Sequence, residues 1–310
     1  MIEVRNLTRY YGDVPAVQDV SFSIKEGQII GMLGLNGAGK STILKTLAGL
    51  LVPSCGTVHI DGVDVVDAPD SLRATIGYLP ESPPLYGDMT VVDYLRHVGR
   101  LKGMSGAAIN QALPNAIQVT QLLGWEKQVI ATLSHGYQKR VGIAQTIIHN
   151  PRLVILDEPI SGLDPRQIVD MRKVIKELGQ GRVVLISSHN LSEISQTCDR
   201  ILILQDGRLI AQGSESELAH RASDSRIAVT VRGEQLAFVE WLEKHPLVER
   251  ADPSLPEPPF ASAVVNLKGD VREEFIPELI SAGYPIRLIE DPDDELEEIF
   301  LNLMRVGGGT

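Results

Sequence analysis

The stretch GLNGAGKST, Gly34 to Thr42, has the residue types and spacing of a phosphate-binding loop. It satisfies the pattern Gly-x4-Gly-Lys-Ser/Thr and lies between an apolar run and a helical pattern. Glycines let successive backbone N–H groups turn toward one anion, and a helix N-terminus adds about half a positive charge. A glycine-rich turn without nucleotide is the simpler alternative, but the lysine and the flanking patterns favour phosphate binding.

Each residue of this loop has an expected contact. Lys40 should reach the β and γ phosphates, Ser41 should offer its hydroxyl to Mg²⁺, and Thr42 should bind the α phosphate. ATP and Mg²⁺ are therefore the predicted ligands. The other loop residues expected to contact the nucleotide are Asn36, Gly37, Ala38 and Gly39.

The stretch LVILDEP, Leu153 to Pro159, is an apolar strand pattern that ends in two carboxylates. Charge at a buried strand end is costly unless it has a function. Asp157 is expected to hold Mg²⁺ through water, and Glu158 to polarise an attacking water as general base. An acidic pair that merely faces solvent is disfavoured, because the phosphate loop would open at the same sheet edge.

The stretch LSHGYQKRVGIAQ, Leu133 to Gln145, predicts a helix with a polar start. Ser134 can cap the helix through its hydroxyl, and Gly136 lets the backbone approach a ligand closely. Such a helix start suits an anion, but taken alone the pattern favours an ordinary capped surface helix, because capped helices are common. The apolar side that should be buried is formed by Val141, Ile143, Ala144 and Ile147.

With these motifs, residues Ile2 to Gln212 resemble the nucleotide-binding subunit of ATP-binding cassette (ABC) transporters. The segment LSHGY stands where that family usually has LSGGQ. In the family this helix start faces the γ phosphate bound by the other subunit. The resemblance therefore implies a head-to-tail dimer closed by ATP, formed with itself or with a homologous subunit, with Ser134 and Gly136 as contacts.

The resemblance also implies roles for residues outside the main motifs. The segment SGLD, Ser161 to Asp164, is similar to the loop that crosses the dimer, and His189 resembles the histidine that senses the γ phosphate. Tyr11 is similar to the aromatic residue that stacks on adenine, with the adjacent Tyr10 as the alternative. Val17 is a further implied nucleotide contact.

The sequence departs from the family pattern at two positions. The segment IGYLPE places Glu81 where the family has a glutamine after a strand. A carboxylate there can still bind Mg²⁺ or water, but it adds negative charge near the phosphates. Tyr137 replaces the signature glutamine, which leaves the implied serine and glycine contacts in place.

The elements that must position these residues alternate between apolar runs and helical patterns. The runs GQIIGML, LVILD and VVLIS each precede a helical pattern, which predicts a parallel sheet with crossover helices. The segments GTVHIDG and RILILQDGRLIAQG predict hairpins with Asp-Gly turns. An inserted helical subdomain is expected over about residues 89–150, starting at the cap Thr90. The fold class implied is an α/β P-loop ABC cassette, with a RecA-like core and an antiparallel β subdomain.

A second domain is expected after the cassette, with the boundary between residues 219 and 220. Residues 220–310 carry eighteen Asp and Glu against nine Lys and Arg, which leaves the first 219 residues at about −2 of the total charge of −11. Strand and helix patterns separated by the loop DPSLPEPPF predict a small acidic α+β domain. The run Glu290 to Glu298 is interpreted as a solvated helix start rather than a cation site.

Composition narrows the functional classes. The two cysteines, Cys55 and Cys198, lack partners at metal spacing, so neither a disulfide framework nor a zinc site is expected. No leader pattern opens the chain, and no run approaches the roughly 20 apolar residues of a membrane helix. The acidic tail disfavours nucleic acid and anionic lipid as direct partners.

These inferences converge on an ATPase subunit of a transporter. We expect a cytoplasmic MgATPase, held at the inner face of the membrane by a separate permease. The stretch IGYLPESPPLYGDMTVVDYL resembles the ABC ATPases that serve ABC-2 type permeases, including exporters and the gliding-motility type, which favours export. The alternative is a soluble ABC ATPase that acts on ribosomes or nucleic acid. A regulatory or dimer-bracing role of the C-terminal domain is a third hypothesis.

Overall fold

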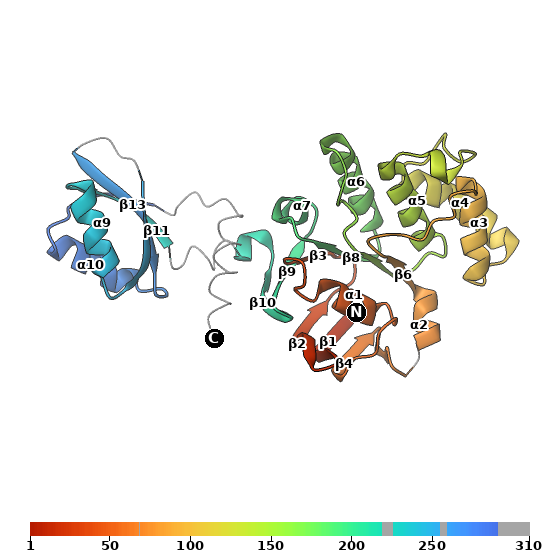
Figure 1. The fold of residues 1–310 in the computed structure, drawn as a ribbon, viewed down its shortest axis with the longest axis horizontal. Coiled ribbons are helices and arrows are strands. Elements are labelled where there is room, and N and C mark those ends of the chain that lie inside the picture. The colour runs from red at the N-terminus through yellow and green to blue at the C-terminus, as the bar shows by residue number, and fades with distance from the viewer. Residues whose placement is uncertain (68, 219–225, 255–258, 291–310) are drawn as a thin grey trace. The chain divides into compact units, whose positions relative to one another are not determined.

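The computed structural model describes residues 1–67, 69–218, 226–254 and 259–290 (Figure 1). The chain divides into two compact units, Met1–Ser214 and Glu215–Thr310, which are described separately. The domain boundary expected between residues 219 and 220 lies outside the described residues, as does most of the acidic run Glu290 to Glu298.

A six-stranded sheet forms the centre of the first unit, in the order β10-β9-β3-β8-β7-β6. Its first five members in chain order pair in parallel, and β10 adds an antiparallel edge to β9. Helices cover both faces (Figure 1), so β3 and β7 are continuous apolar runs, as buried parallel strands are, and β8 is apolar up to its last two residues, Ser187 and Ser188. The strands are β3 (Ile29–Leu33), β6 (Ile76–Leu79), β7 (Leu153–Leu156), β8 (Val183–Ser188), β9 (Arg200–Gln205) and β10 (Arg208–Gly213).

A four-stranded antiparallel sheet packs against the same core, in the order β2-β1-β4-β5. Helix α1 (Lys40–Leu47) lies between the two sheets, and its Ile43, Leu44 and Leu47 are fully buried there. The hairpin predicted for GTVHIDG is confirmed by the pairing of Ile60 with Val63. The strands are β1 (Ile2–Tyr11), β2 (Val14–Ile24), β4 (Cys55–Ile60) and β5 (Val63–Asp64).

The remaining helices of the unit form two groups. Helices α6 (Pro165–Leu178) and α7 (Leu191–Ser195) cover the face of the six-stranded sheet away from α1. Asp164 and Asn190 cap these two helices through their side chains, so helices follow the runs LVILD and VVLIS as predicted. Beyond β6 lie α2 (Pro69–Thr75), α3 (Val91–Leu101), α4 (Gly106–Val119), the 3-10 turn η1 (Ile130–Thr132) and α5 (His135–Ile147).

Close backbone contact fixes α5 against β6. A Cβ atom on Gly77 would lie 2.2 Å from the carbonyl oxygen of Thr146, so only glycine lets the strand and helix approach this closely. The predicted apolar face of α5 is buried, since Val141, Ile143 and Ala144 are all fully inaccessible to solvent. The helix start that resembles the ABC signature is thereby tied to the central sheet.

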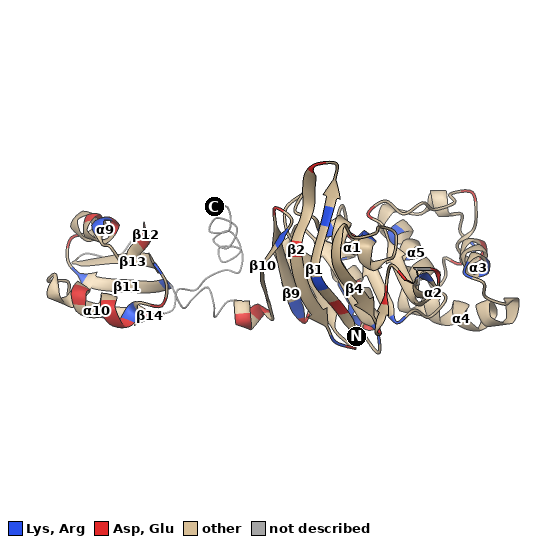
Figure 2. Cartoon of the chain, turned by 90° about the horizontal axis from the view of Figure 1, so that it is seen from below, with Lys and Arg blue, Asp and Glu red and all other residues tan. Residues whose placement is uncertain are grey.

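The second unit has the element order βαββαβ, a split βαβ arrangement. Its strands form an antiparallel sheet in the order β12-β13-β11-β14, and alternate residues of β13 are buried. Acidic side chains gather on α10, whereas both charge signs are interspersed over the first unit (Figure 2). The elements are β11 (Arg226–Arg232), α9 (Gln235–Lys244), β12 (Val248–Pro253), β13 (Phe260–Leu267), α10 (Arg272–Ser281) and β14 (Ile286–Glu290).

The parallel sheet with crossover helices and the separate antiparallel β sheet expected from the sequence are confirmed, and three details differ. Strand β12 was not expected, because its sequence VERADP carries charges on an edge strand and runs into the predicted loop. Helix α2 was not expected either. Ser134 occupies the N-cap position of α5, but its side chain makes no capping hydrogen bond. Among the described residues no helix is both long and apolar enough to cross a membrane.

Replacing Phe238 by alanine tests the core of the second unit. Phe238 is fully buried and its ring centroid lies 5.1 Å from that of Tyr284, so truncation should cost about 3–5 kcal/mol. Chemical unfolding followed by Trp241 fluorescence, in a Trp125→Phe background, measures this loss. The matched control is Leu236→Ala on the same helix, where the side chain is 73% exposed. Equal effects of the two substitutions would contradict the packing described.

Candidate functional site

A cavity of about 470 Å³ opens at the carboxyl ends of β3, β7 and β8. Parallel strands bring their carboxyl ends to one sheet edge, which is where ligands bind in such folds. The phosphate loop, the acidic pair and the histidine thus meet although they are far apart in sequence. The lining residues are Ala16, Leu35, Asn36, Gly37, Ala38, Gly39, Lys40, Ser41, Thr42, Glu81, Glu158, Ser161 and His189.

The loop between β3 and α1 has the backbone of an anion cradle. Gly37 and Gly39 adopt φ values of 90° and 96°, which residues with a side chain rarely adopt. A Cβ atom on Gly39 would also lie 2.6 Å from the carbonyl oxygen of Ala16. Gly39 is the N-cap of α1, so the positive end of the helix faces the cavity.

Lys40 is buried at the floor of this cradle, with 5% of its surface exposed. Its Nζ donates hydrogen bonds to the carbonyl oxygens of Gly34 (2.7 Å) and Leu35 (3.2 Å). The same ammonium lies 3.7 Å from Oε1 of Glu158. The Lys40 ammonium therefore lies between the phosphate loop and Glu158, which follows β7. At this position it can bind an anion held by the loop.

The acidic pair at the end of β7 is held by the neighbouring strand β8. The hydroxyl of Ser187 donates to Oδ1 of Asp157 (2.6 Å) and accepts from the backbone N–H of Glu158 (2.9 Å). Asp157 is 3% exposed and is not among the residues that line the cavity, whereas Glu158 lines it and has φ at 49°. The two carboxylates are thus divided between an inner and an outer position.

Glu158 has the surroundings of a general base. His189 Nδ1 lies 3.1 Å from its Oε2 and Lys40 approaches its other oxygen. Burial raises the pKa of Glu158, and the charges of His189 and Lys40 partly oppose that rise. A carboxylate with a raised pKa, in a cleft beside a lysine and a histidine, is typical of acid–base catalysts.

The residues expected to hold Mg²⁺ supply the right donors. Ser41 and Glu81 line the cavity with oxygen atoms, and Asp157 lies behind them at the strand end. Mg²⁺ binds through one or two carboxylates together with substrate phosphates and waters, rather than in an all-protein cage. In the described part of the chain no group of three or more His, Cys, Asp or Glu could hold a metal alone, and this donor set does not require one.

The start of α5 does not line the cavity of its own chain. Ser134 is exposed, and Gly136 is buried where a Cβ atom would lie 2.5 Å from Oε1 of Gln167. His135 approaches Gly162, in the segment that resembles the loop crossing the dimer. The geometry leaves the Ser134 hydroxyl accessible to a second molecule.

Two other predicted contacts, Tyr11 and Val17, are not among the residues that line the cavity. Tyr11 is 50% exposed at the end of β1, with the Arg9 guanidinium 5.4 Å from its ring centroid, and Tyr10 is 42% exposed. Val17 is fully buried behind Gly39, and its neighbour Ala16 lines the cavity instead.

Two buried side chains at the site, those of Ser187 and Lys139, were not expected from the sequence. Ser187 bridges the acidic pair, and Lys139 on α5 donates from Nζ to the carbonyl oxygen of Glu158 at 2.8 Å. A serine at the end of an apolar strand and a lysine in a helix start are common, so neither motif marks a site. The two basic residues in SHGYQKR were the only signal available.

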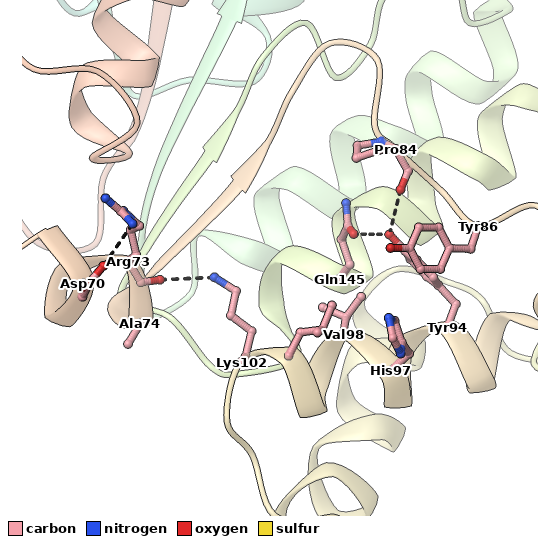
Figure 3. A pocket seen from close by; sticks show the side chains of 11 residues that line it. Asp70, Arg73, Ala74, Pro84, Tyr86, Tyr94, His97, Val98, Lys102 and Gln145 are labelled. Carbon is pink, nitrogen blue, oxygen red and sulfur yellow. Dashed lines mark hydrogen bonds and ion pairs between the residues drawn. The ribbon is translucent and has the colours of Figure 1, made fainter.

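A second cavity, of about 560 Å³, lies between α2, α3, α5 and the segment after β6 (Figure 3). At one end the hydroxyl of Tyr94 hydrogen-bonds to Gln145 of α5 and contacts the carbonyl oxygen of Pro84 at 3.5 Å. At the other end Lys102 Nζ donates to the carbonyl oxygen of Arg73 at 3.2 Å. This groove, lined by Asp70, Arg73, Ala74, Pro84, Tyr86, Tyr94, His97, Val98, Leu101, Lys102 and Gln145, has aromatic and basic ends.

Comparison with known proteins agrees with this geometry. The family model described as ABC transporter matches residues 17–161. An uncharacterized ABC transporter ATP-binding protein of Methanocaldococcus jannaschii is 35% identical over 86% of this chain and 90% of its own. The bacitracin transport ATP-binding protein of Enterococcus faecalis is 32% identical over 100% of this chain and 97% of its own.

Solved structures give the same result for the fold. The ATP-binding subunit of an ABC transporter superposes with a TM-score of 0.64 and 32% identity, over 71% of this chain and 92% of that one. A dimeric cassette in a post-hydrolysis state, bound to ADP and Pi, gives a TM-score of 0.62 and 26% identity, over 69% and 98%. The chain therefore belongs to the family of ABC transporter ATP-binding proteins.

Proposed function

We propose that this ATPase subunit hydrolyses ATP with Glu158 as general base and Lys40 as the main cation for the β and γ phosphates. The observation that carries this assignment is the convergence of Lys40 and His189 on the two oxygens of the Glu158 carboxylate, at 3.7 Å and 3.1 Å. Glu158 would take the proton of the attacking water, and His189 would orient the γ phosphate. Donors fixed in advance around developing charge are the main source of catalysis in phosphoryl transfer.

The same cavity would hold Mg²⁺ with the nucleotide. Ser41, Glu81 and Asp157 would hold the ion, which when bound neutralises the charge of the β and γ phosphates. The loop backbone from Asn36 to Thr42 would bind the phosphates, and Tyr11 would stack on the adenine.

A second copy, or a homologous subunit, would complete the nucleotide site. The exposed Ser134 and the neighbouring Gly136 lie outside the cavity of their own chain, so they would reach the γ phosphate of the opposite subunit. The dimeric ADP-bound and Pi-bound cassette among the similar structures supports this arrangement.

The partner in the membrane would be a separate permease that docks on the groove of the second cavity. The groove adjoins the segment Glu81–Tyr86, one end of which lines the nucleotide cavity. A partner seated there would therefore contact the chain that reaches the phosphates. Relatives named for bacitracin transport, linearmycin resistance and Nod factor export support export, with the subunit at the cytoplasmic face of the membrane.

Replacing Glu158 by glutamine tests the catalytic assignment. The amide keeps the size of the side chain but cannot accept the water proton, so turnover should fall by about 100-fold or more. ATP affinity, measured by titration calorimetry, should stay close to that of the wild type. Glu177→Gln on the exposed side of α6 is the matched control. Turnover that survives Glu158→Gln would rule out this residue as the base.

The proposed docking groove can be tested with the same variant as bait. Glu158→Gln protein with MgATP should recover a polytopic permease from detergent-solubilised native membranes. Adding Tyr86→Ala, which removes a half-exposed ring of the groove, should weaken recovery by about tenfold, as loss of a central contact does.

The control for this capture is Leu123→Ala, an exposed apolar residue outside the groove. Nucleotide binding reports that each bait is folded. Capture of ribosomal or DNA-associated proteins in place of a permease would favour the soluble ATPase alternative. If Tyr86→Ala does not change the recovery of the permease, the docking surface lies outside this groove.

A further inference from the structure

Lys139 is a buried cation that the hydrolytic scheme above does not use. It lies in the first turns of α5 with 4% of its surface exposed. Its Nζ donates to the carbonyl oxygen of Glu158 at 2.8 Å. A buried ammonium is costly unless it is paired or has a task, so its presence beside the catalytic carboxylate requires an explanation.

The backbone of Glu158 is where this contact acts. Glu158 adopts φ of 49°, in the left-handed region that residues with a side chain rarely occupy. Its N–H donates to Ser187 and its carbonyl accepts from Lys139, so hydrogen bonds hold the backbone groups on both sides of this residue. Such conformations persist only where the surroundings determine them, and here they direct the carboxylate at Lys40 and His189.

The same face of α5 packs against the segment that carries Glu81. A Cβ atom on Gly142, one turn beyond Lys139, would lie 2.8 Å from Leu79 Cδ1 and 3.4 Å from Pro83. Glu81 lies between those two positions and faces the nucleotide cavity. Burial lowers the pKa of Lys139, while the nearby charges of Glu158, Glu81 and Glu193 act in the opposite direction.

We propose that Lys139 is a positioning residue for Glu158 and that its charge is balanced by Glu81, so that the two residues act as an interdependent pair. The proposal rests on Glu158 being the general base. Glu81 adds a negative charge beside the phosphates, and Lys139, one turn before the glycine of α5 that packs on the Glu81 segment, offsets that charge. The pair thereby links the start of α5, the segment after β6 and the catalytic strand end within one subunit.

A double-mutant cycle tests the pair. Lys139→Met keeps the length of the side chain but removes both the donor and the charge. It should lower kcat by at least about tenfold while KM for ATP changes by less than about twofold, because the base is misdirected but the phosphate loop is intact. Adding Glu81→Gln to the Lys139→Met chain should raise kcat again by at least about threefold. Such a recovery is the result expected of two coupled residues.

Thermal unfolding measures the same coupling. Lys139→Met should lower the unfolding temperature, and the double variant should recover part of it, even if the single variant is too unstable to assay. Lys173→Met, which removes a 63% exposed ammonium of α6, is the matched control and should change neither quantity. The proposal would be overturned if Lys139→Met left kcat unchanged or changed only KM. It would also be overturned if the effects of Lys139→Met and Glu81→Gln on kcat were independent, so that the double variant showed their simple product.

The result that would contradict the proposed function differs from the results that would contradict the role of Lys139. If Glu158→Gln retains full turnover, the general base lies elsewhere and the scheme for hydrolysis is wrong. If Glu158→Gln is inactive while Lys139→Met turns over like the wild type, hydrolysis by Glu158 stands and only the role of Lys139 is overturned.

Discussion

The hydroxyl of Ser187 is the contact on which the geometry of the candidate site depends, because it ties the two acidic residues at the end of β7 to β8. It donates to Asp157 and accepts from the N–H of Glu158, which separates one inner carboxylate from one that faces the cavity. This division requires adjacent parallel strands that end at the same height. Buried strands in the interior of the sheet provide that alignment with little freedom to shift, since each is paired on both sides.

Much of the site follows from local sequence patterns, because its main residues lie at strand ends and helix starts. The spacing of Gly34, Gly39 and Lys40 predicted the phosphate loop, and the structure has the positive backbone angles that such a loop needs. Contacts between distant segments were not predictable in this way. Nothing local distinguishes Lys139 from a surface lysine, and only the packing of α5 on β6 brings it to Glu158.

The differences between expectation and structure have physical causes. In β12 the buried Val248 and Ala251 are three residues apart across an irregular register, with two exposed charged residues between them. This pattern lacks the alternation of a regular strand and, followed by prolines, resembles a loop, although charges suit an edge strand. Ser134 has the residue type of a helix cap, yet its hydroxyl makes no capping bond, as suits a group that would serve a ligand on another subunit. Val17 supports the loop from behind, while Ala16 next to it forms the cavity wall.

Subunit complementation tests most directly the proposal that the α5 start of a second copy completes each nucleotide site. Lys40→Ala and Ser134→Arg subunits should each be inactive alone, because every site in either homodimer carries the defect. Mixed in equal amounts, they should recover up to about one quarter of the wild-type ATPase activity, since half of the dimers would hold one intact composite site. A mixture of folded subunits that remains as inactive as its components would contradict the account.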